Sequence, residues 1–138
     1  MLCIARRRGF VYVAILSAIA LLAGCGAKSQ TSQVRSKVMQ LATAVSHHDF
    51  QTICTQVLAP QLIEDLVTKA GLSCQQAMKL SGWGTLQDPR MVMDSRISVR
   101  GDRASVPTIT QAKGQKTTAA TLVLTKTSAG WRVSSLAG

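Results

Sequence analysis

The spacing of apolar residues changes near residue 90, and this change constrains the fold more than any other feature of the sequence. Over 34–45 the apolar residues recur every three or four positions, as they do along one face of a helix. Over 118–124 the residues at every second position (118, 120, 122 and 124) form one mostly apolar side, as in a half-buried strand. Helices followed by a meander of antiparallel strands predict an α+β domain, with the N-terminal helices packed on one face of a curved sheet.

Capping residues and helix breakers divide the first part of this pattern into separate helices. Thr31 or Ser32 can cap the first helix, Asp49 can cap the second, and Pro60 interrupts the helical series and suits the start of the third. We therefore expect three or four helices, with candidate ranges 31–47, 49–59, 60–71 and 73–80. The third is expected to turn its apolar residues inward: Leu62, Ile63, Leu66, Val67 and Ala70.

The second part of the pattern predicts four strands after an irregular stretch over 81–89. One strand is expected over 91–99, and a tight turn at Arg100-Gly101-Asp102 leads into the next. That tripeptide also matches an integrin-binding motif, but Gly and Asp are what a short turn requires in any case. The other strands are expected over 103–110, 118–124 and 131–136.

The first 25 residues have the three parts of an export signal. Arg6, Arg7 and Arg8 form a charged start, Gly9–Leu22 is apolar, and small residues then precede Cys25. The tetrapeptide Leu22-Ala23-Gly24-Cys25 resembles the lipobox of bacterial lipoproteins at all four positions. That resemblance implies a diacylglyceryl group on the Cys25 thiol, cleavage between Gly24 and Cys25, and a new amine that is often acylated, commonly with palmitate.

This interpretation divides the chain into a signal peptide over 1–24, a lipidated Cys25 with a short polar tether over 25–30, and one domain over 31–138. Two or more acyl chains make a stable anchor, so we expect the protein at the cell membrane, on its extracytoplasmic side. An uncleaved membrane helix over 9–27 and simple secretion are the alternatives. The export route stays open, because Arg7-Arg8-Gly9-Phe10 resembles a twin-arginine signal but lacks the usual Ser or Thr before the pair.

Cysteine use is consistent with an exported chain. Cys3 belongs to the signal and Cys25 carries the lipid, which leaves Cys54 and Cys74 for an oxidising compartment. We expect these two to form a disulfide, which for a loop of this size contributes about 3 kcal/mol in the chain-entropy model.

The charge of the mature chain is basic but spread out. From Gly26 onward there are 13 Lys and Arg and 6 Asp and Glu, a net charge of 13 − 6 = +7, without a basic run. A diffuse positive field outside the cell suits an anionic membrane or wall surface, and we expect no nucleic-acid partner.

Three segments carry a resemblance to a known family. They are HDFQTICTQVLAPQLIEDLV over 48–67, LSCQQAM over 72–78 and LVLTKTSAGWRVSSL over 122–136. Together they resemble the small NTF2-like domains of exported actinobacterial lipoproteins. The resemblance implies a cone-shaped fold whose sheet wraps a pocket. In many members of the family that pocket binds a small apolar molecule, and in others side chains fill it.

Residues for catalysis or for metal binding are scarce. NTF2-like isomerases and cyclases use a carboxylate base helped by Tyr, whereas the only tyrosine here, Tyr12, lies in the signal. Asp94, expected on the outer side of a strand, and His48 are the only available bases. Adjacent helical residues such as His47 and His48 point about 100° apart and cannot share a metal ion. We therefore expect no catalytic residue, no metal and no cofactor.

Three apolar residues are the candidates for ligand contact: Trp83, Trp131 and Met93. The alternative for each is a place in the core. The resulting hypothesis is an anchored, non-catalytic module that binds a small apolar ligand or an envelope protein. An isomerase-like enzyme and a purely structural component are the alternatives. An apolar cavity on the inner sheet face favours binding, and an acid or His pointing into it favours catalysis.

Overall fold

The computed structural model describes residues 25–137, and the side chains over 30–135. The predicted signal peptide over 1–24, the predicted cleavage after Gly24 and the side chain of Cys25 therefore lie outside the described residues. In the described part, no helix has both the length and the hydrophobicity that a membrane span requires.

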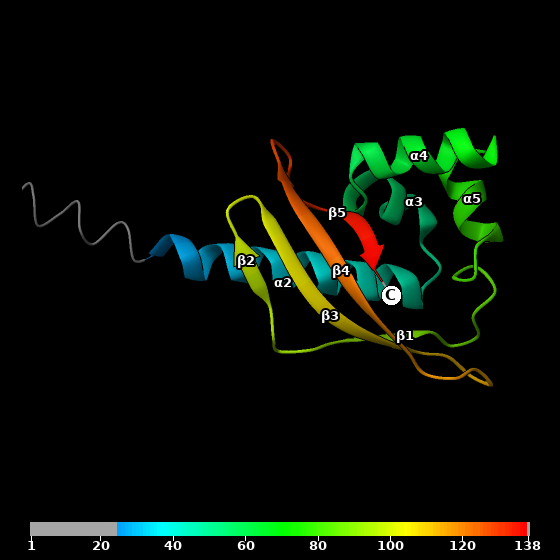
Figure 1. Ribbon diagram of the computed structural model, residues 1–138. Helices are drawn as coiled ribbons and strands as arrows, with labels where there is room; N and C mark the ends of the chain where they lie inside the picture. Colours follow the sequence, from blue (N-terminus) through cyan, green and yellow to red (C-terminus); the bar gives the residue numbers. More distant parts are fainter. Residues whose placement is uncertain (1–24, 138) are drawn as a thin grey trace, which may run out of the picture.

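Helices and a strongly curled antiparallel sheet form the two layers of the fold (Figure 1), which confirms the predicted α+β class. The helical segments are α2 (Cys25–Ser46), α3 (Phe50–Thr52), the π-helical turn η1 (Ile53–Val57), α4 (Pro60–Ala70) and α5 (Cys74–Leu80). The strands are β1 (Arg90–Met93), β2 (Ser98–Arg100), β3 (Arg103–Gln111), β4 (Thr118–Thr127) and β5 (Gly130–Ala137). Their order in the sheet is β1-β3-β4-β5, and β2 pairs with the same edge of β3 as β1.

Helix α2 supplies the apolar stripe that the sequence predicts. Val34, Val38, Leu41 and Val45 are each at most 2% exposed. Its start differs from the prediction, because the helix already begins at Cys25 and includes the segment 25–30 that we expected as a tether. Ala, Lys and Gln in that segment favour helix, and no proline interrupts them, so the capping side chains at Thr31 and Ser32 do not stop it.

The second predicted helix is two short pieces of different geometry. Asp49 caps α3 as expected, and its Oδ1 accepts the N–H of Thr52 at 3.0 Å. The chain then widens into η1, where the N–H of Leu58 donates to the carbonyl of Ile53 at 3.0 Å. Immediately afterwards the N–H of Ala59 donates to Val133 of β5 at 2.8 Å, so the exit of this turn is fixed by the sheet edge rather than by the helix itself.

Helices α4 and α5 have the predicted ends. Pro60 starts α4, Gly71 ends it at a φ of 64°, and Ser73 with Gln76 forms a complete capping box on α5. No residue of α4 is fully buried, however, and Val67 is 39% exposed. The expected inward face is thus half-buried at Leu62, Ile63 and Leu66, and exposed at Val67 and Ala70, because α4 lies at the edge of the core against α5 and β5.

The disulfide between Cys54 and Cys74 is present, as predicted. The two Cα atoms are 6.0 Å apart, and the bond joins η1 to the first residue of α5. It fixes α5 against the core, and α5 in turn leads into the irregular stretch over 81–89.

The strand expected over 91–99 is wrong as a single strand, because it is broken at Asp94 into β1 and β2. The N–H of Asp94 donates to the carbonyl of Pro107 in β3 at 2.9 Å, but Pro107 has no N–H to return the bond. The Asp94 carboxylate instead accepts the backbone N–H of Arg96 at 3.1 Å, which turns the chain locally. Asp94 is therefore in a turn and not in a strand.

Candidate ligand-binding cavity

An open cavity of about 360 Å³ lies at one end of the inner face of the sheet. The sheet contributes residues of β1, β3 and β4, and two loops close the sides. Its lining residues are Gly82, Trp83, Thr85, Leu86, Met91, Thr108, Thr110, Ala112, Gln115, Lys116, Thr118, Ala120 and Leu122.

The cavity arises from a change in side-chain size along two paired strands. On the inner face of β3 and β4 the facing pairs run Ala104 with Leu124, Val106 with Leu122, Thr108 with Ala120 and Thr110 with Thr118. The first two pairs are buried core, whereas the last two consist of small side chains that leave space towards the β3–β4 hairpin. The inner face is therefore core at one end and hollow at the other.

Glycine at position 84 allows the loop over 81–89 to form one side of this cavity. A Cβ at Gly84 would collide with the carbonyl of Lys79, near the end of α5. The N–H of Gly84 donates to Ser81 at 3.0 Å, which keeps the loop tightly turned beside α5. Only a residue without a side chain lets this turn approach the helix so closely, and the adjacent Trp83 thereby lies over the cavity.

The described lining contains no Asp, Glu or His, and Lys116 carries its only charge. Thr108 is 2% exposed, and its hydroxyl donates to the carbonyl of Ala120 at 3.2 Å, so this polar group is satisfied within the sheet. The walls are otherwise apolar or hydroxyl-bearing. Such a surface can hold an apolar molecule, but the described lining offers no base for proton transfer.

His48 does not line the cavity. Its Nε2 donates to the carbonyl of Leu86 at 3.0 Å, and its ring meets Phe50 edge-on with 5.9 Å between the ring centres. It thus connects the turn after α2 to the loop whose Leu86 side chain lines the cavity.

Asp94 likewise does not line the cavity. Hydrogen bonds from the side chain and backbone of Arg96 lower the pKa of its carboxyl to about 2. The closest of these contacts is an ion pair of 2.7 Å with the Arg96 guanidinium. A carboxylate with such a low pKa is a weak base, and its position makes it a structural residue of the turn between β1 and β2.

The three predicted ligand contacts are not brought together. Trp83 lines the cavity, Trp131 is 2% exposed in the core, and Met93 packs against the core without lining the cavity. Met91, two residues before Met93 on the same strand face, lines the cavity instead. Strand alternation could have indicated Met91 as readily as Met93, whereas no signal in the sequence indicated Lys116.

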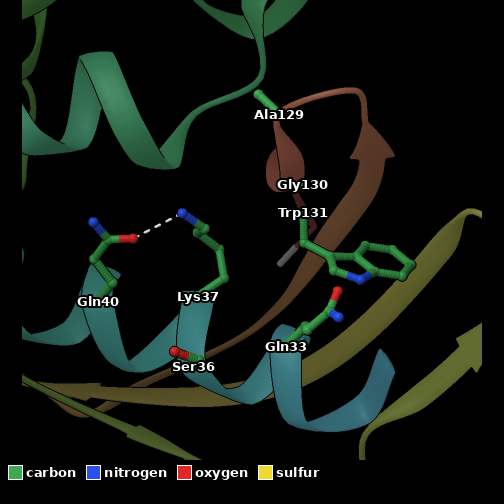
Figure 2. Close-up of a pocket in the computed structure, with 7 residues that line it drawn as sticks. All are labelled: Gln33, Ser36, Lys37, Gln40, Ala129, Gly130 and Trp131. Carbon is green, nitrogen blue, oxygen red and sulfur yellow. Dashed lines mark hydrogen bonds between the residues drawn. The ribbon is translucent and has the colours of Figure 1, made fainter. Parts of the chain in front are cut away.

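A second, shallower hollow of about 250 Å³ lies along the middle of α2, beside the β4–β5 turn (Figure 2). Residues of α2 form one side and the turn with Trp131 the other. Lys37 Nζ donates to Gln40 Oε1 at 2.7 Å and to the carbonyl of Gln56 at 2.9 Å. Partial burial, with a smaller effect of nearby Arg132, lowers the pKa of Lys37. These bonds fasten η1 to α2, so the hollow is the surface of a structural network.

Metal binding and known relatives give no further assignment. Over the described residues, no three His, Cys, Asp or Glu side chains are placed to hold a metal ion. No protein-family model, curated protein or solved structure matches the chain.

Proposed function

We propose that this protein is an exported, lipid-anchored module of the cell envelope that binds a small apolar ligand in the cavity on its inner sheet face. The observation that carries the proposal is an open space of about 360 Å³ with apolar and hydroxyl walls. Ligand sites of small proteins are commonly of this size and character. The absence of an acid or His from the described lining favours binding over the isomerase-like alternative.

The NTF2-like relationship is part of this proposal. Helices precede the strands, and the sheet is strongly curled (Figure 1). The loop after α5 forms one side of the cavity at the hollow end of the inner face. A cone of this kind is what the resemblance implies. Support comes from this order of elements and from the position of the cavity.

The anchor rests on the sequence at Leu22-Ala23-Gly24-Cys25. Cys25→Ser should abolish incorporation of an alkynyl palmitate analogue and release the protein from membranes, because no thiol then accepts the diacylglyceryl group. Cys3→Ser, in the proposed signal peptide, is the matched control and should keep the label. A Cys25→Ser protein that keeps both label and membrane attachment contradicts the anchor.

Photolabelling of membranes that contain the full chain tests the cavity. The probe is an uncharged alkyl alcohol that carries a diazirine and a terminal alkyne. We expect labelled peptides from the loop over 81–89 and from β4. Ala120→Phe should lower this label several-fold, because Ala120 lines the cavity.

Ala119→Phe is the control for that variant. Ala119 is exposed on the opposite face of the same strand and pairs with Ile109. The control should label like the unsubstituted protein. Label spread evenly over the surface, or equal label in both variants, would show that the cavity does not bind the probe.

A further inference from the structure

The cavity has two chemically different ends. Leu122, at its deep end, is fully buried and pairs with Val106 of the core. Towards the β3–β4 hairpin the lining becomes polar and exposed, with Gln115, Lys116 and Thr118. The polarity therefore changes along the inner face, from hydrocarbon at the bottom to a cation and amide at the mouth.

The mouth of the cavity carries a net positive charge. Residues 111–117 include Lys113 and Lys116 and no acid, and Asp88 is the one acid of the adjoining loop over 81–89, whose Gln87 carbonyl accepts the backbone N–H of Lys113 at 2.8 Å. Within the described part of the chain, the one ion pair is Arg96 with Asp94, so Lys116 has no acidic partner there. A lysine ammonium is a flexible point charge with three donors, well suited to a carboxylate or phosphate group.

From these two observations we propose that the ligand is an anionic amphiphile. Its hydrocarbon chain occupies the space between Trp83, Met91 and Leu122, and its acidic head group binds Lys116 at the mouth. This inference rests on the proposed ligand-binding function and adds the chemical class of the ligand. A fatty acid and a lipid phosphate share this chemistry, and the experiment below distinguishes them.

Competition against the photoprobe measures the contribution of the head group. In membranes containing the full chain, octanoate, octyl phosphate and octanol are titrated against labelling of the cavity peptides. We expect the anionic compounds to protect at lower concentrations than octanol. Hexanoate should protect more weakly than octanoate, by about fourfold per methylene removed from the buried chain. The better of octanoate and octyl phosphate identifies the preferred acid.

Substitution of Lys116 separates the cation from the cavity. Lys116→Gln should raise the half-protecting concentration of octanoate roughly fivefold, the upper range for an exposed ion pair, and leave that of octanol unchanged. Lys116→Arg should retain most of the protection. Lys113→Gln is the matched control, because Lys113 lies in the same hairpin but does not line the cavity. Added salt should raise the half-protecting concentration of octanoate and leave that of octanol unchanged.

Two different failures are distinguishable. If octanoate and octanol protect equally, and Lys116→Gln changes neither, the head-group inference is overturned while the apolar cavity stands. If no compound protects and the probe never labels the cavity peptides, the proposed ligand-binding function itself is wrong. If Lys113→Gln weakens octanoate as much as Lys116→Gln, the effect is a general surface charge and the assignment to Lys116 fails.

Discussion

Strands β3 and β4 pair in one register along the whole inner sheet face, but the side chains at the two ends of that face differ. At the closed end, Val106, Leu122 and Leu124 are fully buried with Val133 of β5. At the open end, Thr108, Thr110, Thr118 and Ala120 leave a cavity although their strands continue in unbroken register. Along β3 and β4 the change from core to cavity therefore follows the size of the side chains and not the register.

The largest expected effect is on the free energy of unfolding, and it compares one substitution at each end of the inner sheet face. Leu124→Ala should lower the free energy of unfolding by about 4 kcal/mol, because it creates a void in close-packed core. Thr110→Ala, at the open end, should cost less than about 1 kcal/mol, because its surroundings are already hollow. Denaturant unfolding followed by tryptophan fluorescence measures both. Equal losses would mean that the two ends are packed alike.

Removal of the disulfide comes next. Cys54→Ala should lower the free energy of unfolding by about 3 kcal/mol, through the greater freedom of the unfolded chain. The double variant Cys54→Ala with Cys74→Ala should lose about as much as the single one, since either change removes the bond. The free energy of unfolding of the unsubstituted protein, measured with and without reductant, gives the reference value for loss of the disulfide. A double variant much less stable than the single one would point to packing rather than to the bond.

A smaller effect is expected in the loop beside the open end. Gly84→Ala should destabilise the protein by about 2 kcal/mol and reduce photolabelling of the cavity, because its Cβ would collide with Lys79. Gly82→Ala is the control for stability, because a Cβ at Gly82 meets no atom within 4 Å. Labelling that survives Gly84→Ala would show that the tight turn at Gly84 is dispensable for the cavity.

The smallest effect concerns acid stability at Asp94. Its pKa of about 2 lies below the ordinary value of 3.8, so the Arg96 contact stabilises the folded state above about pH 4. That contribution is lost as the pH falls through about 2. Asp94→Asn should therefore be slightly less stable than the unsubstituted protein at pH 7, and the difference should disappear near pH 2. Thermal unfolding at both pH values tests this, and a difference that grows in acid contradicts it.

Local signals predicted most of the helical half. Asp49, Pro60, Gly71 and Ser73 act within a few residues of the helix ends that they mark, so the sequence alone identifies them. The disulfide followed from counting the cysteines that remain after Cys3 and Cys25 are assigned. The π-helical turn could not be predicted, because the contact of Ala59 with Val133 joins distant parts of the chain.

The features that the sequence did not predict depend on which residues face each other on neighbouring strands. The break at Asp94 depends on Pro107 standing opposite it, and the alternation over 91–99 contains no sign of that pairing. The cavity depends on which small residues face each other, so Trp83 was identified from its own character but Lys116 was not. A cavity that small side chains leave between strands can be identified only once the strand register is known.

The length of helix α2 sets the distance between Cys25 and the far end of the domain. It has 22 residues and starts at Cys25, so it is roughly 33 Å long. The β3–β4 hairpin lies towards its other end (Figure 1). If Cys25 carries the proposed acyl chains, the entrance lies up to a helix length from the anchored residue. An amphiphile would then have to leave its leaflet and cross water before it is captured, so uptake would follow the concentration of dissolved monomer rather than the lipid content of the membrane.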